Sequence, residues 1–239
     1  MKALASGSRI NSASDDAAGL AISEGIRAQN KGNRVAKRNA QDAVSFIQVG
    51  EGGLNEINNI MVRLRELGVQ SASDTVGDTE REFIDQEAQQ LLSEVDRIAS
   101  STRFHNKNLL DGSTETLEFQ VGVDGREHSR IVYESQADAT TSSLGVDGLS
   151  FDSKSGSRDA LEVLDEALEK VGGMRASFGA MQNRLDSTIN NLDSQYENMS
   201  AAQSRIKDAN IAEESSKFVS SQILQQASVG LLAQANQSK

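Results

Sequence analysis

Apolar residues recur at helical spacing along most of the 239-residue chain. The longest stretch without glycine or proline runs from residue 180 to residue 229. Its apolar positions repeat every seven residues, at Leu185, Leu192, Met199 and Ile206. A seven-residue repeat predicts one long helix whose apolar stripe packs against another helix. At about 1.5 Å per residue this helix would span roughly 75 Å, so we expect an elongated molecule.

The N-terminal half carries the same helical spacing. A first helix is predicted to begin at the capping residues in 12–16 and to continue to Gly50. A second helical segment follows Gly53 and continues to about residue 70. Glycines at positions 50, 52 and 53 are compatible with a break between the two segments or with the close approach of another part of the chain. The sequence leaves both alternatives open.

A third helix is predicted after a turn-rich stretch. Thr79 and Glu82 have the spacing of a capping box, which places the start of this helix at Thr79. The second and third helices share a predicted buried seam because their apolar residues alternate by three and four. The seam residues are Leu54, Ile57, Met61, Leu64, Ile84, Leu91 and Val95.

The pattern changes between residues 113 and 156. Apolar and polar residues alternate from Leu117 to Val123, and Asp124-Gly125 follows, so we expect a β-hairpin with a tight turn at that pair. Residues 135–156 are rich in Ser, Thr, Asp and Gly, which predicts irregular surface structure with room for one more short strand. Ser157 is then the predicted cap of the final helix. The predicted fold class is mainly α, an elongated antiparallel helical bundle or coiled coil with a small β-hairpin region.

Charge and hydropathy restrict the partners. The formal net charge of −11 disfavours nucleic acid and anionic membranes. One exception is the basic run Lys31, Arg34, Lys37 and Arg38, whose spacing is more typical of a solvated face or an ion-pairing strip than of a nucleic-acid patch. No apolar run approaches the roughly 20 residues of a membrane span, and residues 1–9 lack the apolar core of a secretory signal. We expect no nucleic-acid partner and no membrane partner.

The sequence offers no residue set suited to catalysis. The chain has no cysteine, and its two histidines, His105 and His128, do not have the spacing of a metal site. The glycines at 50–53 lack the Lys-Ser/Thr pair of a phosphate-binding loop. We therefore predict that the protein is not an enzyme, with no catalytic, cofactor-binding or metal-binding residues and no cofactor.

Several stretches resemble hallmark segments of bacterial flagellin. They are residues 4–20 (LASGSRINSASDDAAGL), 54–59 (LNEINN), 65–72 (RELGVQSA), 223–226 (ILQQ) and 232–236 (LAQAN). The resemblance covers both helical arms, residues 1–112 and 157–239. It implies a structural subunit that is exported unfolded by the flagellar type III apparatus. Outside the cell the subunit would assemble into protofilaments of the flagellar filament, which serves motility.

The resemblance also implies how the chain is organised. Residues 12–112 would be the N-terminal arm of a rod-like core domain, and residues 157–210 its C-terminal helix. Between them, residues 113–156 would form the hairpin and a short variable region. Residues 1–11 and 211–239 would be remnants of an inner domain, which implies a chain truncated at both ends and monomeric by itself.

The implied partners are other flagellin subunits, an export chaperone, the export apparatus and Toll-like receptor 5. The arginine and leucine of the family's receptor-recognition helix fall on Arg63 and Leu67, and the glutamate of the next helix falls on Glu87. From the residues themselves, Glu66 and Gln70 share the outward face of the second helix with Arg63. Leu67 can continue the seam or stand at its edge. The alternative function is a helical adaptor or export-related binding module that forms no filament.

Overall fold

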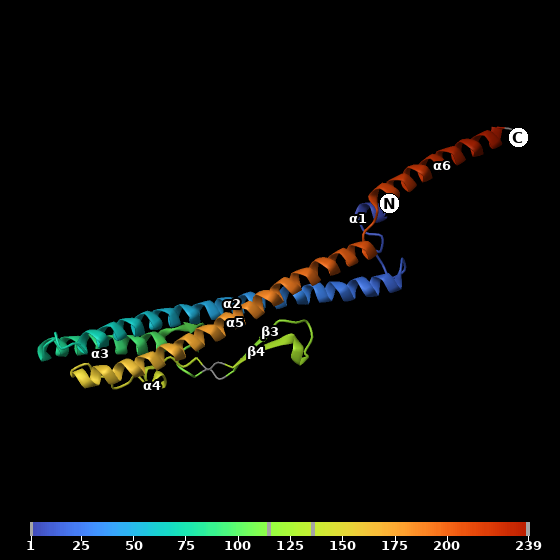
Figure 1. Ribbon diagram of the computed structural model, residues 1–239. Helices are drawn as coiled ribbons and strands as arrows, with labels where there is room; N and C mark the ends of the chain where they lie inside the picture. The colour runs from blue at the N-terminus through green and yellow to red at the C-terminus, as the bar shows by residue number, and fades with distance from the viewer. Residues whose placement is uncertain (1, 114–115, 135–136, 238–239) are drawn as a thin grey trace. The chain divides into compact units, whose positions relative to one another are not determined.

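Helices dominate the protein, for which the computed structural model describes residues 2–113, 116–134 and 137–237 (Figure 1). The elements in chain order are α1 (Lys2–Ser6), α2 (Ala17–Ser71), α3 (Asp78–Ser101), β1 (Arg103–Phe104), β2 (Lys107–Asn108), β3 (Thr116–Gln120), η1 (Glu127–Ser129), β4 (Arg130–Glu134), α4 (Thr141–Leu144), α5 (Lys154–Lys207) and α6 (Ile211–Gln237). The predicted fold class, a mainly helical bundle with a small β-hairpin region, is confirmed.

The chain forms two compact units. The larger unit is Ala36–Asn191, and the smaller unit combines Met1–Val35 with Leu192–Lys239. Both α2 and α5 contribute residues to each unit. The two units are described separately below.

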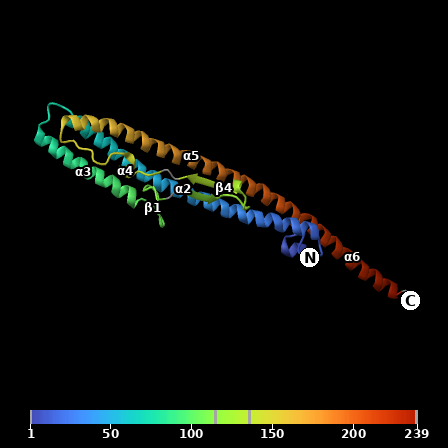
Figure 2. The same cartoon turned by 90° about the horizontal axis from the view of Figure 1, so that it is seen from below.

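In the larger unit, α3 lies side by side with α2 and α5 (Figures 1 and 2). The residues that these helices turn inward form one continuous apolar core. Of the predicted seam residues in this unit, Leu54, Ile57, Met61, Leu64, Ile84, Val95 and Leu185 are buried. Leu91 is only half-buried, because Leu92 takes the inward position between Ala88 and Val95.

The glycines at positions 50–53 lie inside one uninterrupted helix, α2. A β-carbon at Gly50 would lie 2.8 Å from a ring carbon of Phe178, and one at Gly53 would lie 2.7 Å from Leu110 Cδ1. Both contacts are too short for a larger residue at these positions. Of the two alternatives that the sequence left open, the structure therefore selects close packing against other side chains rather than a helix break.

The start of α3 differs from the capping-box prediction. Gly77 occupies the N-cap position with no side-chain cap, and Thr79 lies inside the first turn, so the predicted start is wrong. Arg81 fixes this end of the helix instead. Its buried guanidinium donates to the carbonyl oxygens of Ser71 at 3.0 Å and Ser73 at 2.9 Å. These bonds to the preceding turn are tertiary contacts that a local cap pattern does not contain.

The predicted hairpin is present, since β3 and β4 pair in antiparallel fashion with Leu117 opposite Tyr133. The prediction of a tight turn at Asp124-Gly125 is wrong. Residues 121–129 connect the strands and include η1, and the hydrogen bond from Val121 N to Ser129 O, 2.9 Å long, closes this longer loop. The wider connection therefore replaces a two-residue turn.

The segment after β4 is more buried than its composition predicts. Residues 135 and 136 of the segment lie outside the described residues. Residues 137–153 form α4 and an isolated bridge rather than another strand, and bury Leu144, Val146 and Phe151. Side chains of α3 hold this segment: Asp96 accepts from Thr141 N at 2.9 Å, and Asp85 accepts from Phe151 N at 2.7 Å. Burial here depends on helices that are remote in sequence.

Helix α5 begins at Lys154, so the prediction that Ser157 caps it is wrong. Ser157 is buried within the first turn, where its hydroxyl donates to Ser153 O at 2.8 Å and to Ser71 Oγ at 2.9 Å. The residue therefore joins α5 to the end of α2. A polar residue near the start of a helix can therefore form a hydrogen bond to another helix instead of capping its own.

In the smaller unit, the helix predicted to run without interruption from 180 to 229 breaks between α5 and α6 (Figure 1). Two backbone hydrogen bonds to the N-terminal segment hold this break, from Ala209 N to Gly7 O at 2.9 Å and from Arg9 N to Lys207 O at 2.7 Å. Asn210 then caps α6, because its Oδ1 accepts from Ala212 N at 3.2 Å. The interruption arises from chain contacts rather than from glycine or proline.

Apolar side chains are less completely buried in the smaller unit. Leu192 is buried, but Met199 and Ile206, which continue the same seven-residue repeat, are only half-buried. Asn33 Nδ2 contacts Met199 Sδ at 3.8 Å. The apolar side chains of α6 that the structure describes are largely exposed.

Candidate interaction surface

The second half of α2 has one buried face and one exposed polar face. Met61 and Leu64 are fully buried, so the helical repeat turns Arg63, Glu66 and Gln70 outward. All three side chains are exposed. This face was expected from the spacing of the apolar residues alone.

Helix α3 adds Glu87 to this face. Ile84 and Ala88 are buried against the core, which leaves Glu87 exposed between them. We call Arg63, Glu66, Gln70 and Glu87 the ion-pair surface. It combines residues from two helices of the larger unit.

Arg63 links the two helices of the ion-pair surface. Its Nη2 lies 2.8 Å from Glu87 Oε1 and its Nε donates to the same oxygen at 3.0 Å, while its Nη1 donates to Glu66 Oε2 at 3.0 Å. The hydrogen bond to Glu87, followed by the one to Glu66, raises the pKa of Arg63. The guanidinium bridges α2 and α3 through these hydrogen bonds, although it remains 48% exposed. An exposed pair of this kind adds little to folding stability, so its residues are free to serve in recognition.

Leu67 belongs to the core rather than to this surface. It is 1% exposed and packs with the other inward residues of α2. The structure thus favours the seam position for Leu67 over the edge position.

Sequence reasoning missed Phe83, which lies on α3 one turn before Glu87. Its side chain is 64% exposed. The residue precedes buried Ile84 and so falls outside the three-and-four spacing of the core, a signal that was available in the sequence. An exposed aromatic residue beside a charged cluster is typical of contact surfaces between proteins.

The described residues provide no site for a metal ion: no cluster of three or more His, Cys, Asp or Glu side chains occurs in 2–113, 116–134 and 137–237. Across the same residues, no helix is long and apolar enough to cross a membrane. An open hollow beside β4 is lined by Tyr133, Met174 and Met181. Burial raises the pKa of the Tyr133 hydroxyl.

Comparison with known families identifies both arms of the chain. The family of the bacterial flagellin N-terminal helical region matches residues 1–115, and that of the bacterial flagellin C-terminal helical region matches residues 161–239. These are helical structural proteins. The chain belongs to the bacterial flagellin family.

Relatives are similar along almost the whole chain. A flagellin of Halalkalibacterium halodurans is 43% identical over 238 residues, which cover 99% of this chain and 87% of the relative. The flagellar filament core protein flaB2 of Brachyspira hyodysenteriae is 42% identical over 251 residues, with 99% and 87% covered. The similarity therefore includes the residues between the two family matches.

Solved structures agree with the fold. The crystal structure of Bacillus cereus flagellin is 32% identical, with a TM-score of 0.58, over 70% of this chain and 94% of that one. A putative flagellar hook-associated protein from Vibrio parahaemolyticus has a TM-score of 0.69 over 81% and 100% of the two chains. At 12% identity, the second likeness shows the fold alone.

Proposed function

We propose that this chain is a secreted subunit of the extracellular flagellar filament that packs against other subunits through the ion-pair surface. Relatives named as filament core proteins support the assembly, and the exposed Arg63–Glu87 pair carries the choice of surface. Before assembly, the chain would pass through the export apparatus with the help of an export chaperone. It would act as a structural protein rather than an enzyme.

The geometry of Arg63 suits a contact that forms and re-forms between subunits. Arginine presents several donors in a rigid plane and is common at the centre of protein interfaces. In the free chain, Glu66 and Glu87 hold the guanidinium in place. A neighbouring carboxylate or carbonyl group can then replace one of them without reorganisation of the helix.

The same surface is our proposed site for Toll-like receptor 5. With Leu67 in the core, the exposed residues available to a receptor are Arg63, Glu66, Gln70 and Glu87. We expect Arg63→Ala to weaken activation of receptor-expressing reporter cells by about 30-fold, as for an interface hot spot of about 2 kcal/mol. Arg97→Ala is the matched control, because Arg97 forms an equivalent exposed pair with Glu94 on α3. Equal responses of the two variants would remove Arg63 from the site.

Filament formation is tested separately. A bacterium that lacks its own filament subunit would express the protein, and negative-stain microscopy would look for filaments on the cell and in the medium. Filaments that form with the wild type and shorten with Arg63→Ala support the proposal. Secreted protein without filaments would favour the adaptor function instead.

A further inference from the structure

The two strands of the hairpin lie against different helices of the larger unit. On β3, the ring of Phe119 lies 5.9 Å from that of Phe46, which belongs to α2. On β4, the ring of Tyr133 lies 5.7 Å from that of Phe178, which belongs to α5, and the strand runs beside this helix (Figures 1 and 2). The outer edge of β3 therefore faces α2, and the outer edge of β4 faces α5.

The hydrogen-bond pattern shows which backbone groups lie on the outer edge of β4. Val121 N donates to Ser129 O at 2.9 Å, so these two opposite residues form a hydrogen-bonded pair. Such pairs alternate along an antiparallel ladder, and the register places Arg130 and Val132 at the intervening positions of β4. The N–H and C=O groups of Arg130 and Val132 therefore point away from β3.

The outer edge of β3 is hydrogen-bonded, whereas that of β4 is open at Val132. Gln120, opposite Arg130, turns its carbonyl toward α2, where the oxygen accepts from Asn39 Nδ2 at 3.0 Å. Among the described residues, the N–H and C=O groups of Val132 have no hydrogen-bond partner, and the residue is 43% exposed. Open backbone groups on a strand edge are a template for pairing with another strand.

The open edge of β4 borders the hollow between β4 and α5. This hollow has a volume of about 760 Å³, and Val132 lines it together with Met174 and Met181 of α5. Gly173 also lines the hollow, and a β-carbon at this position would meet no heavy atom within 4 Å. Sites of this volume accommodate bound ligands, so the hollow has room for the side chains of an added strand.

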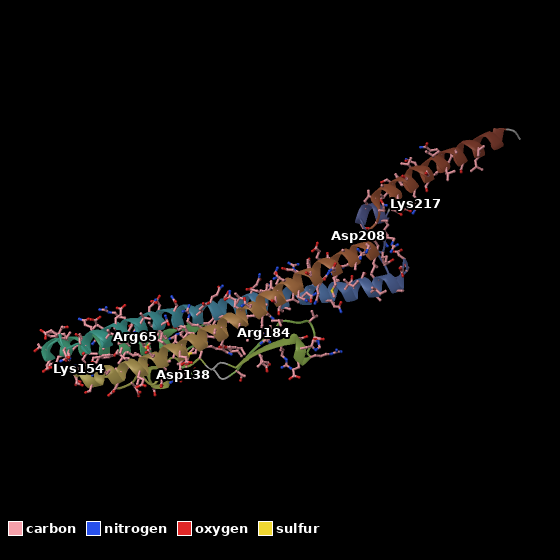
Figure 3. The ribbon with its side chains drawn as sticks, viewed as in Figure 1. Arg65, Asp138, Lys154, Arg184, Asp208 and Lys217 are labelled. Carbon is pink, nitrogen blue, oxygen red and sulfur yellow. The ribbon has the colours of Figure 1, made fainter. Side chains whose placement is uncertain are left out.

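Two cations mark the α5 side of the hollow. Lys170 and Arg184 are 14 positions apart on one helix, which is about 21 Å at about 1.5 Å per residue. Figure 3 shows Arg184 on α5 at the level of the hairpin. The described residues that line the hollow include no carboxylate, and neither cation forms an ion pair within the described part of the chain. Negative charge is therefore favoured at both ends of the hollow.

We propose that this hollow binds an extended acidic peptide of a partner protein, which adds a strand to the open edge of β4. The peptide backbone bonds to the N–H and C=O groups of Val132, and its carboxylates contact Lys170 and Arg184. In a seven-residue strand, the first and seventh residues point to the same face and lie about 20 Å apart, which matches the spacing of the two cations. The hollow shares no residue with the ion-pair surface, so the inference goes beyond the proposed filament contact.

Fluorescence anisotropy with the full chain tests charge recognition. The probe is the labelled peptide Asp-Thr-Val-Thr-Val-Thr-Asp, which reads the same in both directions and so presents an aspartate to each cation whichever way the strand runs. Arg184→Glu should weaken its binding at least about tenfold, because attraction becomes repulsion. The control Arg158→Glu reverses an exposed arginine of α5 outside the hollow and should change binding by less than about twofold. No binding to the wild type, or equal losses in both variants, would overturn the proposal.

Two neighbouring glycines of α5 test the location. Gly173→Trp places a large side chain in the hollow and should weaken binding of the same peptide at least about tenfold. Gly172→Trp is the matched control, because its β-carbon also meets open space but Gly172 does not line the hollow. Circular dichroism shows that both variants keep their helices. Equal affinity of the two variants for the peptide would place the binding site elsewhere and overturn the proposal.

Amide exchange resolved by NMR tests strand addition. With the peptide bound, exchange of the Val132 amide should slow at least about tenfold, because this amide gains an acceptor. The amide of Ile131, which lies in a hydrogen-bonded pair with Phe119, should change by less than about twofold. Binding without slower exchange at Val132 would contradict strand addition.

Two further measurements separate the other occupants of the hollow. Decanedioate is a linear dianion without backbone amides, and we expect it to compete with the peptide only weakly. Equal affinity for decanedioate would overturn the proposal in favour of a small acid. Protection of the Val132 amide that rises with protein concentration in the absence of peptide would overturn it in favour of a second copy of this chain.

Discussion

The two units contain parts of the same two long helices but bury them to different degrees. In the larger unit, α3 and the segment 137–151 surround α2 and α5, and the inward residues are almost completely buried. In the smaller unit, the seven-residue repeat continues from Leu192 to Ile206, but burial decreases along it. The repeat therefore determines where a helix turns its apolar side, while the number of neighbouring elements determines how much of that side is buried.

Helix α6 is the extreme case within the smaller unit. Its exposed apolar side chains are Ile211, Phe218, Val219, Ile223, Leu224, Val229, Leu231 and Leu232. They are as apolar as the core residues of the larger unit. An exposed apolar group of this extent is typical of a surface that contacts another protein.

Shortening one leucine in each unit to alanine should give the largest difference between the units in the free energy of unfolding. Leu64→Ala removes a fully buried side chain and should lower the free energy of unfolding by about 3–5 kcal/mol. Leu224→Ala removes a side chain that is 67% exposed and should change it by less than about 0.5 kcal/mol. Urea titration followed by circular dichroism measures both values. Similar losses for the two variants would mean that α6 is buried in solution.

Two glycines of α2 test how closely the larger unit is packed. Gly50→Ala forces a β-carbon against Phe178 and should destabilise the protein by about 1–3 kcal/mol. Gly52→Ala meets open space and should stabilise it by about 0.5–1 kcal/mol, because alanine is the better helix former. Thermal unfolding of both variants gives the comparison. A stabilising Gly50→Ala would show that Phe178 can move away.

Amide hydrogen exchange should be faster in the smaller unit than in the larger unit. Amides in residues 199–206 of α5 should exchange at least about tenfold faster than those in residues 54–64 of α2, because local opening exposes less apolar surface in the smaller unit. Exchange followed by mass spectrometry of peptides measures the ratio. Equal protection in both segments would indicate that the chain unfolds as one cooperative body.

A fall in pH should have the smallest effect on stability. It should act on the larger unit through the Arg65–Asp165 pair. The hydrogen bond from Arg65 holds the pKa of Asp165 below its usual value of 3.8. A depressed pKa adds stability above the unfolded value, and this stability is lost as the pH falls through the folded value. The melting temperature of Asp165→Asn should therefore be slightly lower than that of wild type near neutral pH and equal to it well below pH 3.8. A constant difference at all pH values would contradict this assignment.

The outward positions of Arg63, Glu66 and Glu87 follow from helical spacing, because inward residues flank each of them. The exposure of Phe83 follows from the same spacing, although sequence reasoning missed it, whereas the burial of Leu67 did not follow in the same way. Leu67 lies at the edge of the spacing pattern, where only the position of α3 and α5 decides burial. The two capping predictions failed because Arg81 and Ser157 bond to Ser71, which is distant in sequence from Ser157.

The sequence by itself determined the long helical stretches, the hairpin strands and most of their inward positions, because these depend on the periodicity of apolar residues along short stretches. Only the tertiary structure decided the uninterrupted passage of α2 through Gly50 and Gly53 and the break of the C-terminal helix at residues 208–210. Both depend on residues far along the chain: Phe178 and Leu110 fill the space beside the glycines, and Gly7 binds the backbone at the break. Contacts between residues far apart in the chain leave no pattern in a short stretch of sequence.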